Sequence, residues 1–527
     1  MGSQRMGKSQ RKSTIEGIKE KEKLFSKGRE HSNALVELLE IVQSDDKSVT
    51  AHAVKSLQRI FLQLLDRDEL TADQPEAKTN AGEEKAKVPS RPEDQYKYWL
   101  QARYQDCLRC LTRVMGAFTD VPALQALSLS SLMKLLQAES NHPLLKKNLD
   151  GYAFPTCILT HVVPKLLSRD LDMKDLIAEF REYLEYDDVR FFVLAQVNKC
   201  IILKKDKESA KEDLTTFCSN TFALLEQVSM PTTEADLGNY FCCAPDKGQE
   251  VKVTMLKEHR KQFSNVWLAF LSLDLPPAVY KKTLVSLHET VMPHMANPLM
   301  LTDFLSVSYN IGGAISLLAL NGLFILMTQH NLEYPEFYKK LYALFEPGIF
   351  HVKYKARFFH LANLFLSSAY LPAYMVAAFV KRLSRLALTA PPTALMLVVP
   401  FVGNLLVRHP SCQVMVHRAD SPSGVSDDPF VTSEIDPAKC HALDSSLWEL
   451  HTLKSHYHPG VARAADFIDR PFTKVEWDIS EYMDLSSGEM IGWITSKKMR
   501  RAPVEFEPVK GLFSSKDDIF SKFWSFD

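Results

Sequence analysis

The sequence predicts an all-α protein, a HEAT/armadillo-like helical repeat (an α-solenoid) with disordered linkers and tails. Three observations favour this class. Leucine-rich stretches place apolar residues at helical spacing through most of the chain. Glycine is scarce, with 19 among 527 residues, which disfavours turn-rich β architectures and glycine-rich nucleotide folds. Between residues 251 and 409, prolines recur so that two helices begin every ~35–40 residues, the period of such repeats.

The bulk composition restricts the class of protein. A hydrophobic content of 46% and a charged content of 24% are those of a folded globular chain. The formal net charge of −1 excludes a uniformly basic nucleic-acid binder. Nine cysteines, an odd number at irregular spacing, argue against a disulfide framework and for a reducing compartment. The charged N-terminus lacks the apolar run of a secretory signal, so we expect an intracellular protein.

The N-terminal third alternates between charged and periodic stretches. Residues 1–30 carry nine Lys or Arg and four Glu, which predicts a basic disordered arm. Residues 31–65 are predicted to form the N-terminal helices, because leucines recur there three and four positions apart. Residues 66–94 contain almost no large apolar side chains and are therefore predicted to be a disordered linker.

Proline marks the helix starts in the rest of the chain, because its ring suits the first helical turn and stops the preceding helix. Helices of the dense section are expected to begin near Pro277, Pro298, Ile311, Pro335, Tyr354, Pro372 and Pro392. The remaining predicted segments are a helical region over 95–230, a loop over 231–250, the helical repeat core over 251–409, a polar loop over 410–440, a C-terminal helical segment over 441–484 and a tail over 485–527.

The opening residues match a phosphate-binding pattern. Gly2, Gly7, Lys8 and Ser9 fit G-x-x-x-x-G-K-[ST]. The pattern binds nucleotides only where a buried strand delivers the loop and a helix leaves it, and only Met1 precedes Gly2. We therefore interpret the match as accidental and keep a P-loop nucleotide hydrolase as the less favoured alternative.

A long acid-free window carries the strongest charge signal. Between Pro347 and Ala419 there is no Asp or Glu, whereas residues 420–490 hold fourteen acids and five bases. The bases of the window are Lys353, Lys355, Arg357, Lys381, Arg382, Arg385, Arg408 and Arg418. This pattern fits a solvated helix face, docking between the two segments, contact with RNA phosphates or an acidic protein partner. All of these bases except Arg418 are predicted partner- or RNA-binding residues.

The same window resembles a known family. The stretches that carry the resemblance are SLLALNGLFILMTQHNLEYPEFYKKLYALFEPGIF, HVKYKARFFHLANLFLSSAYLPAYMVAAFVKRLSRLALTAPP and SSLWELHTLKSHYHPGVARAADFI, the last at residues 445–468. They are similar to the CCAAT-binding-factor-type domain of the nucleolar complex proteins, over about residues 300–480. The resemblance implies stacked helices and a non-enzymatic nucleolar factor for ribosome biogenesis. It also implies membership of the small-subunit processome, a complex with nucleolar protein 14, and support of pre-rRNA processing and small-subunit maturation, with pre-rRNA contacted directly or through partners.

No chemistry-bearing site is predicted. Cys107 and Cys110 form a CxxC without a second pair, and the histidines of HYHP lie at a helix end, where imidazoles commonly cap carbonyls. No catalytic motif is present, so we expect no enzyme, no metal and no cofactor. Segment 445–468 is expected to dock against the core or a partner, with Trp448 and Tyr457 as anchors.

Three apolar stretches also resemble membrane spans, at about 304–328, 361–380 and 394–407. The alternative they support is a multi-pass protein of the nuclear envelope. Pro372 lies inside the second stretch, and the third has only about fourteen residues before Arg408. Helices that are apolar all round also fill the inside of a solenoid, which is the interpretation we favour.

Overall fold

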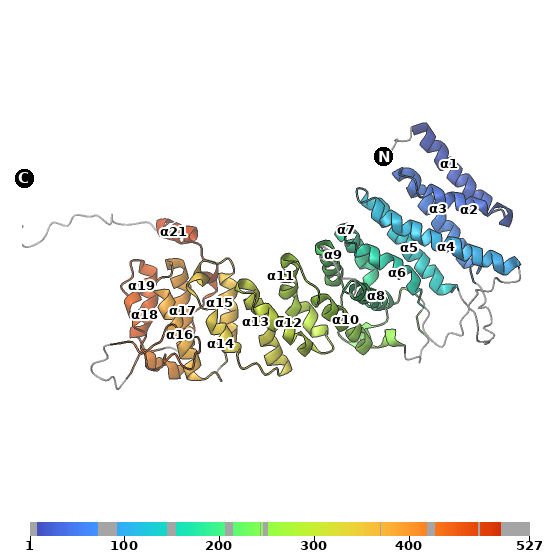
Figure 1. Cartoon of the computed structure of the whole chain (residues 1–527). Helices are drawn as coiled ribbons and strands as arrows, with labels where there is room; N and C mark the ends of the chain where they lie inside the picture. Colours follow the sequence, from blue (N-terminus) through green and yellow to red (C-terminus); the bar gives the residue numbers. More distant parts are fainter. Residues whose placement is uncertain are drawn as a thin grey trace, which may run out of the picture. The chain divides into compact units, whose positions relative to one another are not determined.

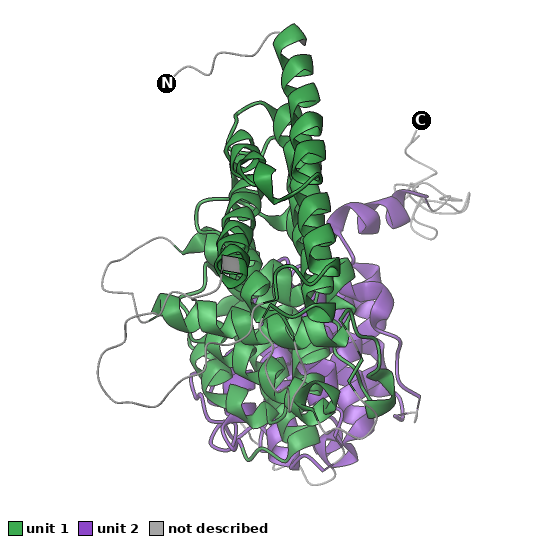
Figure 2. Cartoon of the chain, turned by 90° about the vertical axis from the view of Figure 1, so that its right-hand side faces the viewer, with its two compact units in different colours: residues 1–333 green, residues 334–527 purple. Residues whose placement is uncertain are grey.

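The fold is built of helices alone over the residues that the structure describes. The computed structural model describes residues 8–71, 92–144, 154–205, 214–242, 244–245, 251–368, 370–418, 427–472 and 475–496. Within these ranges every regular element is helical, and the chain divides into two compact units, Met1–Glu333 and Tyr334–Asp527 (Figure 2). The predicted all-α helical repeat is therefore confirmed.

Unit 1 stacks helices against neighbours that lie close in sequence (Figure 1). Its helices are α1 (Lys8–Phe25), α2 (Asn33–Ile41), α3 (Lys47–Asp66), α4 (Pro92–Ala117), α5 (Pro122–Asn141), α6 (Thr156–Leu166), α7 (Lys174–Leu184), α8 (Asp187–Lys205), α9 (Thr215–Glu226), α10 (Leu256–Leu271), α11 (Pro277–Ser286), α12 (Thr302–Tyr309) and α13 (Gly313–His330). Among the closest pairs are α3 with α5, α4 with α5, α8 with α10, and α12 with α13. Such neighbour-to-neighbour packing is typical of repeat proteins.

Unit 2 is organised around one buried helix. Its helices are α14 (Phe337–Ala343), α15 (Lys355–Phe365), α16 (Ala373–Ala387), α17 (Pro392–Arg408), α18 (Trp448–Leu453), α19 (Pro459–Ala465), α20 (Ser480–Met483) and α21 (Ser487–Ser496). Nearly every residue of α17 from Thr393 to Leu406 is buried. Helices α16, α19 and α20 pack against it, so α17 is the core of this unit.

The predicted disordered arm over residues 1–30 is corrected by α1, which spans Lys8–Phe25 and packs on α2 and α3. Ile15, Ile18 and Phe25 repeat at helical spacing, and Ile18 is completely buried. Ion pairs such as Arg11 with Asp46, at 2.5 Å, hold the helix in place. The apolar stripe is narrow, and the surrounding Lys and Glu residues concealed it in the sequence.

The P-loop match is not supported by its surroundings. Lys8 and Ser9 form the start of α1, and residues 8–71 contain no strand that could deliver a phosphate-binding loop. Gly2 and Gly7 lie outside the described residues.

Two segments that are predicted to lack regular structure contain helix in their described parts. Residues 72–91 of the predicted linker and 497–527 of the predicted tail lie outside the described residues. The other parts of these two predicted segments include helix: α4 begins at Pro92, and α21 occupies Ser487–Ser496. The division between the units falls inside the predicted core over 251–409, which therefore belongs to both.

Two buried carboxylates hold the described part of the 231–250 loop against α8. Asp187 accepts hydrogen bonds from the backbone N–H groups of Gly238 at 2.7 Å and Asn239 at 3.0 Å. Asp188 accepts from those of Phe241 at 3.0 Å and Cys242 at 2.9 Å. This loop is thus attached to the repeat by charge-assisted hydrogen bonds.

The three apolar stretches that resemble membrane spans differ in their helical structure and burial. In the described part of the chain, one helix, α13, is long and apolar enough to cross a membrane, and half of it is buried inside the protein. The stretch 361–380 is not a continuous helix, because α15 ends at Phe365 and α16 begins only after Pro372. The stretch 394–407 lies in the shorter helix α17, inside unit 2. Burial in the solenoid accounts for the apolar character of α17 and of half of α13.

Candidate functional site

The basic window and the acidic segment meet inside unit 2, where Lys381 of α16 is the centre of an ion cluster. Its ammonium lies 2.7 Å from Glu449 Oε1 and 3.0 Å from Asp428 Oδ2, and it donates to the carbonyl of Ser446 at 2.7 Å. The side chains of Lys381 and Glu449 are both completely buried. Two opposite charges removed from water in this way depend on each other.

Arg385, one helical turn further along α16, completes the arrangement. Its guanidinium lies 3.2 Å from Asp428 and 3.5 Å from Glu449, and it stacks over the Trp448 ring at 4.8 Å. Trp448 in turn donates its Nε1–H to Asp428 at 2.9 Å. We call Lys381, Arg385, Asp428, Trp448 and Glu449 the buried ion cluster.

The pKa values of the two carboxyl groups of the buried ion cluster are shifted in opposite directions. Burial raises the pKa of Glu449, and the hydrogen bond and charge of Lys381 oppose that rise. Burial also acts to raise the pKa of Asp428, but hydrogen bonds from Ser445, Trp448 and the backbone of Phe430 outweigh it, so this pKa lies well below its usual range. Asp428 is therefore ionised near neutral pH and lies between the two cations Lys381 and Arg385.

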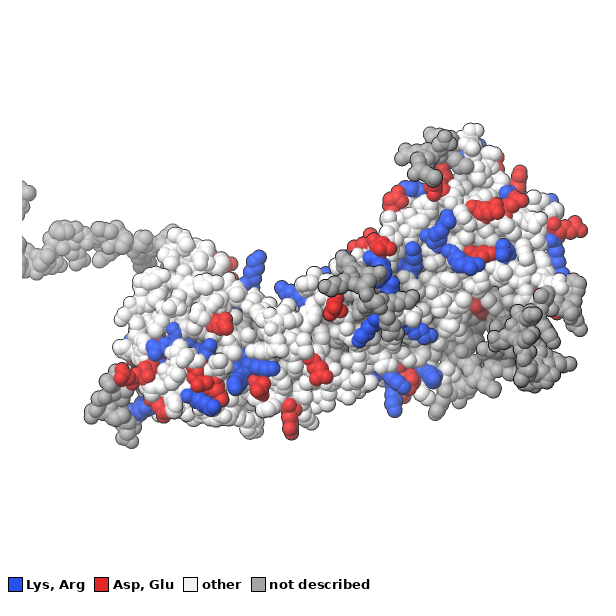
Figure 3. Space-filling model, in the orientation of Figure 1, with Lys and Arg blue, Asp and Glu red and all other residues white. Residues whose placement is uncertain are grey.

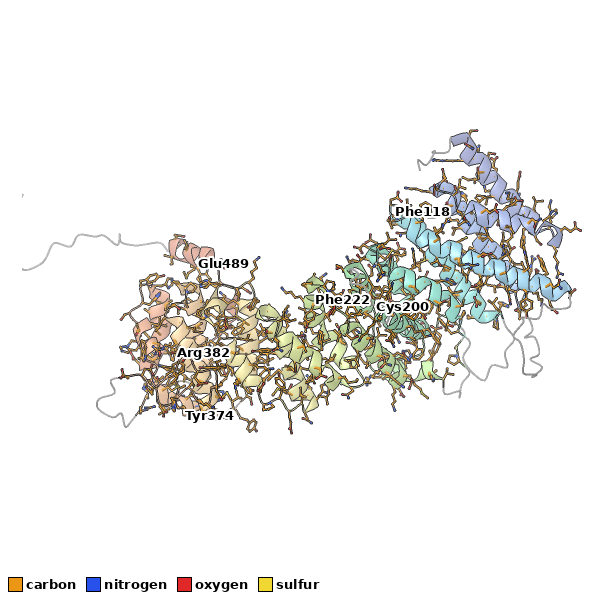
Figure 4. The ribbon with its side chains drawn as sticks, in the orientation of Figure 1. Phe118, Cys200, Phe222, Tyr374, Arg382 and Glu489 are labelled. Carbon is orange, nitrogen blue, oxygen red and sulfur yellow. The ribbon has the colours of Figure 1, made fainter. Side chains whose placement is uncertain are left out.

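Arg382 belongs to a different contact of the same helix (Figure 4). Its Nε donates to the carbonyl of Phe345 at 2.8 Å, and its guanidinium lies over the Tyr342 ring at 4.4 Å. Burial raises the pKa of Tyr342 to about 12, and the nearby Arg382 opposes that rise. Arg382 therefore ties α16 to the end of α14.

A second contact joins α17 to residues 475–479. The Asn404 side chain donates to the carbonyl of Trp477 at 2.8 Å and accepts from its backbone N–H at 2.7 Å. Arg408 binds both carboxylate oxygens of Glu476, at 2.7 and 2.5 Å. The Trp477 ring lies directly over Gly403, where an added Cβ would come within 2.6 Å of it. We call Gly403, Asn404, Arg408, Glu476 and Trp477 the C-terminal clamp.

Changing Gly403 to Ala should open the C-terminal clamp. The new methyl group would overlap the Trp477 ring, so we expect the free energy of local opening of residues 475–479 to fall by about 1–3 kcal/mol. Hydrogen exchange of the Trp477 amide, which donates to Asn404, measures this directly.

The control is Gly17→Ala in α1, where nothing lies within 4 Å of the added Cβ. That change should leave Trp477 untouched and stabilise α1 by about 1 kcal/mol. Unchanged exchange at Trp477 in the Gly403→Ala protein would refute the role assigned to the glycine.

Four of the bases that are predicted to bind a partner or RNA make contacts inside unit 2, and their partner-binding role stays a prediction. Lys381, Arg385 and Arg408 bind carboxylates of the acidic segment, so the docking of the two segments uses them. Arg382 instead binds Phe345 and Tyr342 at the end of α14. On the face of unit 2 turned to the viewer, basic and acidic side chains are interspersed rather than gathered in one field (Figure 3). Internal docking was one of the alternatives that the charge pattern left open.

The other predicted residues are more accessible. Lys353 and Arg357 are exposed at the start of α15, and Lys355 between them is half-buried. Burial lowers the pKa of Lys355, while nearby Asp484 opposes that shift. Tyr457 is 79% exposed, and Trp448 is 39% exposed although its N–H is used internally. Their role in binding a partner stays a prediction.

The histidines and cysteines have structural surroundings. His458 Nδ1 accepts from the backbone N–H groups of Gly460 and Val461, so it caps the start of α19 rather than carbonyls at a helix end. Cys107 is buried, and burial raises its pKa. Among the described residues no three His, Cys, Asp or Glu side chains are grouped closely enough to hold a metal ion.

Comparison with known proteins gives two family matches and a set of full-length relatives. Residues 8–209 match the model described as nucleolar complex protein 4-like, TPR repeats, and residues 316–465 match the CBF/Mak21 family. The chain is 44% identical over 502 residues to the nucleolar complex protein 4 homolog of Gallus gallus, covering 95% of this chain and 97% of the relative. The chain belongs to the nucleolar complex protein 4 family. The human homolog is 42% identical, covering 93% and 94% of the two chains, and that of Danio rerio is 40% identical, covering 95% and 94%.

The matched ranges include helix α1 and the buried ion cluster, but only part of the C-terminal clamp. The TPR match begins at residue 8, where α1 begins, so this helix belongs to the repeat. The CBF/Mak21 match includes α16 and α18 and hence the whole buried ion cluster, whereas Glu476 and Trp477 of the C-terminal clamp lie beyond it. Sequence reasoning missed Asp428, Glu449 and Glu476, whose only signal was the excess of acids after residue 420. It also missed Asn404 and Trp477, for which no signal is present in the sequence.

Proposed function

We propose that the chain is a non-enzymatic structural subunit of the nucleolar small-subunit processome, which supports pre-rRNA processing and small-subunit maturation in a complex with nucleolar protein 14. Identity of 40–44% to named nucleolar complex protein 4 homologs over almost the whole chain carries this proposal. The helical repeat supports it, because stacked helices present extended surfaces to other macromolecules.

The architecture of unit 2 suggests how such a subunit stays ordered. Lys381, Arg385 and Arg408 attach the acidic segment to α16 and α17, which holds this segment in place within unit 2. The exposed residues Lys353 and Arg357, together with Tyr457, are the predicted positions that remain open to a partner or to pre-rRNA.

Affinity purification of the tagged full chain from nuclear extract tests the function. We expect nucleolar protein 14, other processome proteins and early pre-rRNA to be recovered together at stoichiometric levels. Depletion of the chain should also cause small-subunit rRNA precursors to accumulate. Recovery of large-subunit precursors alone, or normal processing after depletion, would contradict the proposal.

Reversing two exposed charges tests whether Lys353 and Arg357 contact pre-rRNA. The double change Lys353→Glu and Arg357→Glu should weaken association with pre-rRNA particles by about tenfold if these bases contact phosphates. Co-sedimentation with the particles over a salt series measures the loss. The matched control is Lys281→Glu with Lys282→Glu, the same charge change on exposed residues of α11. Equal behaviour of the two double variants would remove Lys353 and Arg357 from the interface.

A further inference from the structure

The stacked helices of unit 1 form two layers that differ in charge. Helices α4, α6 and α8 pack on one another in turn, and helices α5, α7 and α9 form a second layer in the same way. The first layer carries nine Lys or Arg and five Asp or Glu, whereas the second carries three Lys or Arg and five Asp or Glu. Because the whole chain has a net charge of −1, the excess of bases is a property of this layer.

Most acids of the first layer do not offset its exposed bases. Asp187 and Asp188 of α8 are buried and accept hydrogen bonds from the backbone of the loop after α9. Two more acids lie in the first turn of α4. Within these three helices Asp106 is thus the one acid that lies among the remaining bases, and it pairs with Arg103 at 2.9 Å and with Arg109.

Three bases of α4 and α6 lie within about two turns of each other near the C-terminal end of α4. Burial and the nearby Arg109 lower the pKa of His161 on α6, so this ring is neutral near pH 7. Arg113, one turn beyond Arg109, is exposed and donates to a backbone carbonyl just after α2 at 3.1 Å. The Lys165 ammonium lies over α4 at Gly116, where an added Cβ would overlap it. Neither Arg113 nor Lys165 forms an ion pair with a carboxylate of the described residues.

A hollow of about 440 Å³ lies beside two of these bases, between α2 and α4. Three guanidinium groups line it, those of Arg103, Arg109 and Arg113, and they outnumber the carboxylates of Asp106 and Glu40. A planar guanidinium can bind two phosphate oxygens at once. The volume is that of a small-ligand site and accommodates a phosphate group with its sugar.

The exposed bases extend across the first layer, and the second layer has the opposite charge. Lys199 is exposed on α8, and Lys and Arg side chains lie along α4 on the face turned to the viewer (Figure 3). Packed helices lie about 8–10 Å apart, so the layer from α4 to α8 is about 20 Å wide. Asp175, Glu179 and Glu182 are exposed on α7 of the second layer. An extended row of bases suits a polyanion with repeating charges better than a single acidic group.

We propose that the α4–α6–α8 layer of unit 1 binds the phosphate backbone of RNA. Arg109, Arg113 and Lys165 contact successive phosphates, and the acids of α7 keep the strand away from the second layer. Contacts to phosphates alone carry no base sequence, so we expect binding without sequence preference. The proposal rests on the proposed function for the identity of the RNA as pre-rRNA.

Fluorescence anisotropy of a labelled oligouridine of about 15 nucleotides, titrated with the purified full chain, provides the test. We expect saturable binding that weakens as the salt concentration rises from about 50 to about 200 mM. The combined change Arg109→Gln, Arg113→Gln and Lys165→Gln should weaken binding at least about tenfold at the lower salt concentration. It should also reduce the slope of log Kd against log salt concentration by about two, because three phosphate contacts are lost.

The matched control is Lys134→Gln, Lys174→Gln and Arg181→Gln, the same change of charge on exposed residues of α5 and α7, which should alter Kd less than about twofold. Thermal unfolding of both variants verifies that the fold is retained. Equal RNA binding by the two variants, or no saturable binding by the unmodified chain, would overturn the proposal. Tighter binding of a labelled oligoglutamate than of the oligouridine would also overturn it, in favour of an acidic protein partner.

The affinity purification from nuclear extract tests the processome assignment separately. Recovery of nucleolar protein 14 and early pre-rRNA, together with equal oligouridine binding by the two triple variants, would refute the RNA-binding layer and leave the proposed function standing. Loss of binding in the first variant without recovery of processome components would refute the proposed function instead.

Discussion

Replacing Lys381 with Met should destabilise unit 2 by about 3–5 kcal/mol, because the change leaves the buried carboxylate of Glu449 without its closest cation. Arg385 remains 3.5 Å from Glu449, but it is already shared with Asp428. Methionine keeps the length and most of the volume of lysine, so the loss reports charge rather than a cavity. Urea unfolding followed by tryptophan fluorescence measures the change.

Two variants distinguish the buried ion cluster from a general effect of losing a lysine. Lys381→Met combined with Glu449→Gln removes both charges, and we expect it to recover most of the lost stability. Lys353→Met, at an exposed position in the same unit, should change stability by less than about 0.5 kcal/mol. A single Lys381→Met variant as stable as the unmodified protein would show that the ion pair contributes nothing net.

Glu139→Gln should stabilise unit 1 by about 3 kcal/mol above pH 7 and have little effect near pH 5. Glu139 of α5 is 8% exposed and accepts a hydrogen bond from Tyr104 of α4 at 2.9 Å. Burial raises its pKa from 4.5 to about 7, against the lowering effect of the Tyr104 hydrogen bond. Glutamine keeps an acceptor for Tyr104 but never ionises.

The direction of this pH dependence follows from the number of protons that Glu139 binds in the folded and unfolded chain. In the unfolded chain Glu139 loses its proton near pH 4.5, whereas in the folded chain it keeps the proton until about pH 7. Between these values folding requires uptake of a proton, so the stability of unit 1 falls as the pH rises, and the full penalty is present above pH 7. The Gln variant lacks this dependence.

Thermal unfolding at pH 5 and pH 8 measures the difference. Glu20→Gln, at an exposed position of α1, is the control and should behave like the unmodified protein at both pH values. A Glu139→Gln protein that is less stable at pH 8, or that gains equally at pH 5, would show that the carboxyl group is not held in its protonated form.

The positions of several helix starts could be predicted from the sequence because their causes are local. Proline fixes its own φ angle and cannot continue a helix, and α11 and α17 begin at Pro277 and Pro392, as the spacing predicts. Helix α16 likewise begins directly after Pro372. Apolar periodicity depends on neighbours within two turns, which is why the all-helical class also followed from the sequence.

The prediction for residues 1–30 was wrong because their many charged residues concealed the apolar stripe of α1. The excess of Lys and Glu in residues 1–30 indicated a solvated arm, yet a narrow stripe including Ile18 is enough to bury α1 against α2 and α3. Burial of a stripe depends on whether a complementary surface exists elsewhere, which composition does not report.

The sequence by itself determined the helical class, several helix starts, the family and the presence of two segments of opposite charge. Only the tertiary structure decided that Lys381 is buried and that Arg385 meets Asp428 43 residues further along the chain. The physical reason is the separation along the chain over which each interaction acts. Backbone geometry and helical periodicity act between neighbouring residues, whereas the partner of a charge is chosen by the packing that brings distant segments together and excludes water from them.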